Sequence, residues 1–103
     1  MAKNIHHQMG KVLRTLMFEG KIDARMICDL TYSTTPSRRI ADLREVFKGS
    51  LERSINRHGY AEFRLADDAQ TRLRHKYWQL CEDYDSDADV RVALWKWARS
   101  QVW

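Results

Sequence analysis

The side chains best suited to binding chemistry in this sequence are basic and small polar residues gathered in one short stretch. Guanidinium and ammonium groups bind phosphate oxygens, and a guanidinium can donate two hydrogen bonds to the O6 and N7 atoms of one guanine. Small side chains beside them let a base edge come close. The stretch around Pro36 combines both kinds, at Thr35, Ser37, Arg38, Arg39, Ala41, Arg44 and Lys48.

Helical periodicity predicts how this stretch is presented. Apolar residues recur at the spacing of one helix face, at Ile40, Leu43 and Phe47. Thr34 or Thr35 can act as N-cap, Pro36 suits the first helical position, and Gly49 is a stop signal. The expected element is a short helix that buries its apolar stripe and turns small and cationic side chains outward, as a DNA-reading helix does. In that role Arg38 would read a guanine, whereas Arg39, Arg44 and Lys48 would bind phosphates.

After Gly49 the apolar residues alternate with a period of two, which predicts a β-hairpin up to Leu65. Gly59 supplies the turn because it can take a positive φ. Three residues at the tip are candidates for DNA contact: Asn56, Arg57 and His58. Arg57 could enter a minor groove or bind backbone. On the strands, Arg53 and Arg64 would neutralise phosphates or simply solvate the outer face of the sheet.

Elements on both sides must position this stretch. Apolar spacing predicts a first helix over residues 5–18 and a second over residues 24–30, with Asp23 as N-cap. Between them, Ile22 is expected to form a one-residue strand arm. A fourth helix is predicted from Asp67 or Asp68 to about residue 84. A fifth starts within residues 87–89, where acidic side chains suit the positive end of the helix dipole.

The last helix has two roughly opposite apolar faces. A helix at the end of a small domain is expected to bury only one of them against its own core. The second face therefore indicates a partner surface, most simply a second copy of the chain. Its residues are Val92, Trp95, Val102 and Trp103. The alternative is that the two tryptophans lie flat on the domain edge or on a frayed terminus.

The order helix, β arm, helix, turn, helix, hairpin is that of a winged helix. Residues 9–65 also resemble a family of short phage and prophage helix-turn-helix proteins, through G-K-I-D-A at Gly20–Ala24 and R-R-I-A-D-L-R-E at Arg38–Glu45. The hairpin fits the wing that follows in that family. The resemblance implies an α+β, mainly α, winged helix-turn-helix fold that binds DNA, often as a regulator. We expect this unit over residues 1–66 and two further helices over residues 67–103, packed on it as one compact domain.

Composition excludes several classes of protein. With 103 residues there is room for one domain, and the formal net charge of +4 permits a nucleic-acid partner without requiring one. No stretch has the apolar length of a membrane span or a signal core, so a cytoplasmic location in a bacterium or phage-infected host cell is expected. The two cysteines, Cys28 and Cys81, are expected to be free and buried.

Neither a metal site, a cofactor nor an enzyme is expected. The adjacent His6 and His7 point to different helix faces, and no C-x-x-C or H-x-x-x-H spacing occurs. The aspartates from Asp83 onward imitate a calcium loop, but Ala88 occupies the position that requires glycine and Leu94 the position of the closing glutamate. No phosphate-binding glycine loop, nucleophile elbow or acid–base pair is present.

Two functional hypotheses follow from these patterns. The first is a sequence-specific binder of double-stranded DNA, a small phage or prophage transcriptional regulator that acts as a homodimer. The second is a protein-interaction module on the same scaffold, such as a phage-encoded inhibitor of a host enzyme or defence complex. Asp42, Glu45 and Glu52 dilute the basic face, and four tryptophans suit a protein interface.

Overall fold

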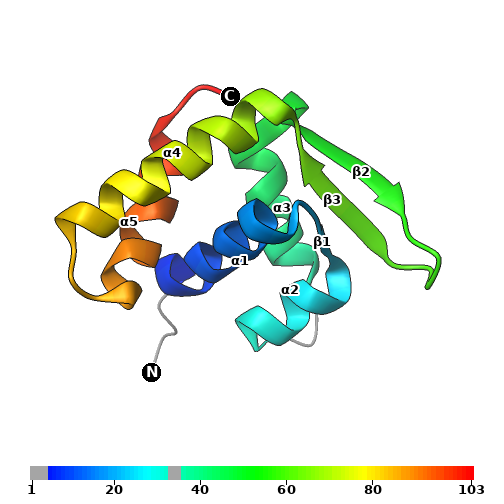
Figure 1. The fold of residues 1–103 in the computed structure, drawn as a ribbon. Helices are drawn as coiled ribbons and strands as arrows, with labels where there is room; N and C mark the ends of the chain where they lie inside the picture. The colour runs from blue at the N-terminus through cyan, green and yellow to red at the C-terminus, as the bar shows by residue number, and fades with distance from the viewer. Residues whose placement is uncertain (1–4, 33–35) are drawn as a thin grey trace.

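The computed structural model describes residues 5–32 and 36–103, and within them the chain is mainly helical with one small antiparallel sheet (Figure 1). The elements follow one another as α1 (Ile5–Glu19), β1 (Ile22–Asp23), α2 (Ala24–Thr31), α3 (Ser37–Phe47), the 3-10 turn η1 (Lys48–Ser50), β2 (Leu51–Ile55), β3 (Ala61–Leu65), α4 (Asp67–Asp83) and α5 (Asp87–Ser100). This order confirms an α+β, mainly α, class. In the described part of the chain, no helix is long and apolar enough to cross a bilayer.

Local signals account for most element boundaries. The Asp23 carboxylate accepts a hydrogen bond of 2.9 Å from the Met26 backbone N–H, as an N-cap should, and α2 follows it. Pro36 directly precedes α3 rather than opening it, and the proposed caps Thr34 and Thr35 lie outside the described residues. At the other end of α3 the residue with a positive φ is Lys48, at 48°, one residue before the predicted stop at Gly49.

The sheet has the strand order β1-β3-β2, with all neighbours antiparallel. Phe63 in the central strand lies opposite Ile22 on one side and Arg53 on the other. Because partners across an antiparallel pair share a face, Arg53 lies on the same face as buried Phe63 and Leu65. Arg64 lies opposite Glu52 in the strand register, and both belong to the other face of the sheet. The predicted hairpin is therefore present, and the strand arm at Ile22 has two residues.

In the described part of the chain, a single hydrophobic core joins the elements from α1 to β3 with α4 and α5. Leu13 of α1, Leu43 of α3, Leu73 of α4 and Leu94 of α5 are all fully buried in it. The tightest approach is between α1 and α5, at Gly10. A Cβ atom at this position would lie 2.2 Å from the Arg91 carbonyl oxygen, so only glycine lets the two helices come this close.

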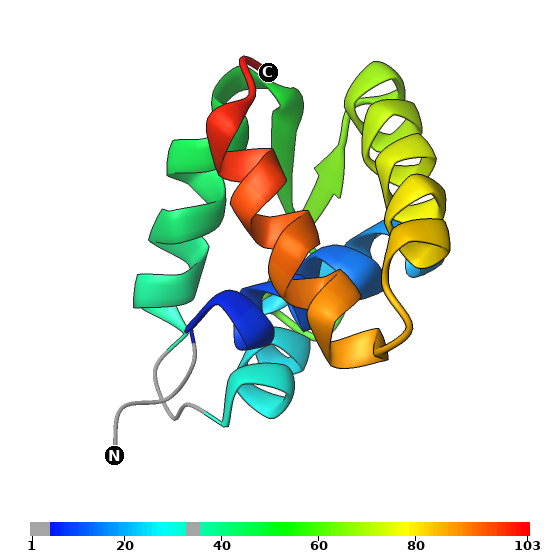
Figure 2. The same ribbon diagram turned by 90° about the vertical axis from the view of Figure 1, so that its left-hand side faces the viewer.

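The expectation that the second apolar face of the last helix is exposed is wrong for Trp95, which is 3% exposed. The premise fails because α5 packs against both α1 and α4 and also stands between α3 and α4, so that more than one of its sides is covered (Figure 2). The tail folds back, and the Trp103 ring lies 4.8 Å from that of Phe47 while its indole N–H donates to the Ala98 carbonyl at 2.9 Å. Val92 is half-buried, whereas Val102 is 92% exposed.

The burial expected for the cysteines is also wrong in part. Both thiols are free, but Cys28 is half-buried and Cys81 is exposed. Cys81 follows Leu80, which faces the core, and is rotated away from it along α4. One residue of helical rotation therefore separates a core position from a surface position here.

Candidate nucleic-acid interface

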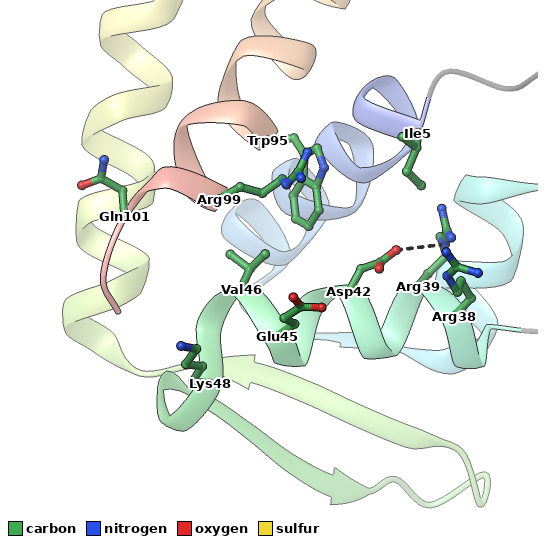
Figure 3. A pocket seen from close by; sticks show the side chains of 10 residues that line it. All are labelled: Ile5, Arg38, Arg39, Asp42, Glu45, Val46, Lys48, Trp95, Arg99 and Gln101. Carbon is green, nitrogen blue, oxygen red and sulfur yellow. Dashed lines mark ion pairs between the residues drawn. The ribbon is translucent and has the colours of Figure 1, made fainter.

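The outer face of α3 and the hairpin border the same groove. This hairpin-side groove has a volume of about 500 Å³ and is lined by Ser37, Ile40, Ala41, Arg44, Arg53 and Ala61. The first four come from α3 and the last two from β2 and β3. In Figure 3 the hairpin runs alongside α3, with its tip toward the N-terminal end of the helix. Small and cationic residues thus meet in one accessible channel.

The opposite flank of α3 borders a second hollow, which we name the α5-side cavity (Figure 3). Its volume is about 460 Å³. Its lining residues come from α1, α3, the turn after α3, α5 and the tail: Ile5, Arg38, Arg39, Asp42, Glu45, Val46, Lys48, Trp95, Arg99 and Gln101. Three predicted DNA-contact residues, Arg38, Arg39 and Lys48, therefore border this cavity and not the hairpin-side groove.

The predicted cations of α3 differ in their availability. Arg39 forms an ion pair with Asp42, with Nε 3.3 Å from a carboxylate oxygen, and both side chains are largely buried. Arg38, Arg44 and Lys48 are exposed and make no ion pair in the described part of the chain. Hence these three residues can bind a partner without first breaking an ion pair within the chain, whereas Arg39 would have to give up its pair with Asp42.

The hairpin tip divides into a structural and an exposed part. The Asn56 side-chain oxygen accepts hydrogen bonds from the His58 and Tyr60 backbone N–H groups, at 3.0 and 3.1 Å, and its amide donates to Asp23 at 3.2 Å. These bonds hold the turn and attach it to the start of α2, so Asn56 has a structural role. Arg57 and His58 are exposed and free for contact.

The segment from α3 to β3 is moderately basic. Residues 37–65 contain seven Arg and Lys residues against four Asp and Glu residues. The pKa of His6 is lowered by burial and further by Lys96 and Arg99, which disfavour another positive charge.

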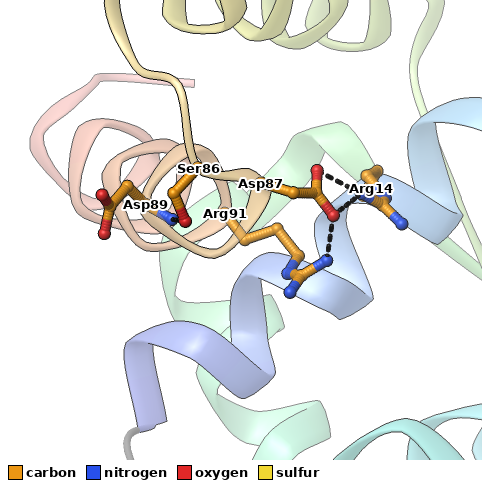
Figure 4. Close-up of polar contacts among 5 residues, drawn as sticks. All are labelled: Arg14, Ser86, Asp87, Asp89 and Arg91. Atoms are coloured by element: carbon orange, nitrogen blue, oxygen red, sulfur yellow. Dashed lines mark hydrogen bonds and ion pairs between the residues drawn. The ribbon is translucent and has the colours of Figure 1, made fainter.

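A polar network at the start of α5 fixes the helix that forms one wall of this cavity (Figure 4). Asp87 accepts two hydrogen bonds of 2.7 Å from Arg14 on α1 and is also paired with Arg91 one turn along α5. The pKa of Asp87 is therefore lowered, chiefly by the hydrogen bonds from Arg14. Ser86 caps the helix by accepting from the Asp89 backbone N–H.

Arg53 was predicted to neutralise phosphates or to solvate the outer face of the sheet, but it lies on the face of Phe63 and borders the hairpin-side groove. The alternation of Arg53 with Leu51 and Ile55 is the signal for that face. Arg99 reaches the α5-side cavity from the far end of the chain, and no local pattern signals that. Thr35 lies outside the described residues. Among residues 5–32 and 36–103, no cluster of His, Cys, Asp and Glu could hold a metal ion.

Comparisons with known proteins identify no relative of this chain. No protein-family model, no curated protein and no solved structure matches this chain. Functional inference therefore depends on the residues of the groove, the cavity and the exposed surface.

Proposed function

We propose that this chain is a winged helix-turn-helix protein that binds double-stranded DNA, as a small transcriptional regulator of phage or prophage type. In this proposal α3 enters the major groove and the hairpin acts as the wing, on the backbone or in the minor groove. The observation that supports it most directly is the shared hairpin-side groove. Ser37, Ala41 and Arg44 of α3 border it together with Arg53 of the hairpin, so both DNA-contacting elements would meet one duplex.

Each exposed residue has a role that follows from its chemistry. Ser37 and Ala41 are small and exposed, so α3 can approach base edges closely. Arg38, near the N-terminal end of α3, is available to donate two hydrogen bonds to a guanine, a contact worth about 1–3 kcal/mol of discrimination. Arg44 and Arg53 would bind phosphates along the groove, and Arg57 at the tip would bind backbone or the minor groove.

The tryptophan-bearing tail does not compete for this surface. Trp103 packs against Phe47 and Trp97, and Arg72 lies over its ring at 4.3 Å. These contacts hold the tail at the C-terminal end of α3. The residues of the hairpin-side groove include none from the tail. A duplex could thus reach α3 while the tail stays in place.

Fluorescence anisotropy with a labelled pool of random-sequence duplexes tests the proposal. Arg38→Ala combined with Arg57→Ala is expected to weaken binding about tenfold or more at low salt, and wild-type affinity is expected to fall steeply as salt rises. The matched control is Arg74→Ala with Lys96→Ala, which removes the same charge from residues that border neither hollow beside α3. Equal losses in both double variants, or binding that does not depend on salt, would refute a DNA-binding surface formed by α3 and the hairpin tip.

A homodimer would double the number of phosphate contacts and remains part of this proposal. Trp95 cannot contribute to its interface because it is buried within the chain. Val102 is the residue of the predicted interface that is fully available. Sedimentation equilibrium of the wild type and of Val102→Asp tests this step, since a dimer through the tail would dissociate in the variant.

A second candidate function, protein interaction, is favoured by an exposed aromatic cluster on the other side of the molecule. Phe18 is 52% and Trp78 54% exposed, their rings lie 6.2 Å apart, and both contact Tyr77. Figure 2 shows α4, which contributes Trp78, on the side opposite α3. Exposed aromatic residues are typical anchors of protein interfaces. Pull-down from nuclease-treated bacterial lysate tests this candidate, and only a stoichiometric partner lost in Trp78→Ala would support it.

A further inference from the structure

We propose that the α5-side cavity binds a small phosphate-bearing ligand of nucleotide size. The cavity has a volume of about 460 Å³, within the range of roughly 300–1,000 Å³ that is usual for small-molecule sites. It lies beside α3 but on the flank away from the hairpin (Figure 3). Its ligand is therefore distinct from a duplex held in the hairpin-side groove.

The charge of the lining favours an anion. Arg39 and Asp42 neutralise one another, with 3.3 Å between nitrogen and oxygen. The other charged residues in the lining are Arg38, Lys48 and Arg99 against Glu45. A positive surplus remains after Glu45 is counted, and it is best matched by a ligand with at least two negative charges. Guanidinium groups donate paired hydrogen bonds to phosphate oxygens, which suits a diphosphate better than a single carboxylate.

The cationic groups stand on different walls. Arg38 comes from α3 and Arg99 from α5, and Figure 3 shows Arg99 above the cavity beside Trp95, with Arg38 on the helix below. A ligand that engages both must span the space between two helices. Ile5 and Val46 also line the cavity and supply apolar contact, and the buried Trp95 forms part of its wall. A compact anion with an apolar or aromatic body therefore fits better than inorganic phosphate alone.

Such a ligand would also affect α3. Arg38 and Lys48 border the cavity, and both are exposed cations that a DNA duplex could also contact. A bound polyanion would neutralise part of this charge and lower DNA affinity, and by linkage DNA would lower ligand affinity by the same factor. This second step depends on the proposed DNA binding, whereas ligand binding in the cavity does not.

Nuclear magnetic resonance titration of the DNA-free protein tests the site, with ADP, pyrophosphate and adenosine as probes at constant ionic strength. ADP is expected to shift the Trp95 indole N–H resonance saturably, pyrophosphate to bind more weakly, and adenosine weakest of all. Arg99→Gln should weaken ADP binding about tenfold, since it removes a charged donor. Lys96→Gln, which removes the same charge from α5 outside the cavity, should not. Glu45→Gln should strengthen binding by removing a repulsive charge, an effect that a merely structural role would not produce.

Three results would overturn the proposal: no saturable shift with millimolar ADP, equal weakening by Arg99→Gln and Lys96→Gln, or adenosine binding as tightly as ADP. A DNA-binding assay run in parallel separates the two proposals. If ADP binds the free protein but DNA does not, the cavity stands and the duplex proposal fails. If DNA binds and none of the probes shifts Trp95, the groove stands and the cavity proposal fails.

Discussion

Helices α3 and α5 each have a second face beyond the one that fills the core, and the fold treats these faces differently. On α3 the second face carries small and polar residues, and Ser37, Arg38 and Ala41 stay exposed on it. On α5 the second face includes Trp95, which is buried as completely as Val90 on the first face. An amphipathic helix can thus display a polar face for binding, whereas a helix that is apolar on two sides is enclosed by its own chain.

Enclosure of α5 depends on how closely its neighbours approach. Gly10 on α1 lets the α5 backbone come close. Trp103 in the tail covers the C-terminal end of α5, and its indole N–H donates a hydrogen bond to the Ala98 carbonyl. The ion pair between Arg14 and Asp87 holds the first turn of α5 against α1. The contrast therefore predicts that substitutions on α5 and its neighbours change stability, while those on the outer face of α3 change binding.

Replacing Trp95 with alanine should have the largest effect. Removal of a buried tryptophan side chain leaves a cavity and costs about 3–5 kcal/mol of unfolding free energy. Urea denaturation followed by circular dichroism measures this loss at several protein concentrations. The control Val102→Ala, at a position that is 92% exposed, should change stability by less than about 0.5 kcal/mol. A Trp95→Ala protein with wild-type stability would mean that the residue is not a core anchor.

Gly10→Ala should be the next most damaging change. The added methyl group would lie 2.2 Å from the Arg91 carbonyl oxygen, so α1 and α5 must separate. Overpacking against backbone is expected to cost about 3 kcal/mol, which exceeds the roughly 1 kcal/mol that alanine gains over glycine in a helix. Gly49→Ala is the matched control, because a Cβ there meets no atom within 4 Å. Equal midpoints in urea for both variants would refute the close approach.

These same positions show which parts of the fold could be predicted from the sequence. The cap at Asp23, the inward stripe of Leu43 and Phe47 and the turn at Gly59 depend on neighbours in the sequence, and the structure has all of them. The burial of Trp95 was missed because it depends on helices far away in the sequence. A helical pattern gives the angle between two faces but not how many neighbours will cover them.

In the candidate site, too, local patterns predicted some residues correctly, whereas the placement of others depends on tertiary packing. Ser37 and Ala41 were predicted on the outward face of the helix and Arg44 on its flank, and all three border one groove. The assignment of Asn56 to DNA contact missed its bond to Asp23, since only the folded sheet brings the hairpin tip to the start of α2. The arrangement of Arg99 opposite Arg38 likewise arises from tertiary packing and has no signature in the sequence.

Arg44→Gln should leave stability unchanged and reduce DNA affinity. Arg44 is exposed, borders the hairpin-side groove and forms no ion pair in the described part of the chain. Because Arg44 is proposed to contact a phosphate, its replacement should weaken binding to all duplexes to a similar degree, severalfold at low salt. It should also reduce the slope of log affinity against log salt by about 1. Anisotropy titrations at four salt concentrations measure that slope. A loss confined to one sequence would reassign Arg44 to base reading.

Asp87→Asn should have the smallest effect, and one that depends on pH. Hydrogen bonds from Arg14, with the charge of Arg91, lower the pKa of Asp87 in the folded protein. A carboxylate with a depressed pKa contributes stability above its unfolded pKa, near 4, and loses it as pH falls through the folded pKa. Because the side chain is 56% exposed, the contribution at neutral pH is about 0.5–1 kcal/mol.

The difference in unfolding free energy between wild type and Asp87→Asn should therefore be largest at neutral pH. It should shrink as pH falls from about 4, where the carboxyl of the unfolded chain takes up a proton, through the lower pKa of the folded protein. Urea denaturation across this range measures it. Asp89→Asn is the matched control, because it removes the same charge from the first turn of α5 without breaking an ion pair in the described part of the chain. A pH-independent difference for Asp87→Asn would show that the carboxylate acts through packing alone, and that α5 is held against α1 by Gly10 and the core rather than by charge.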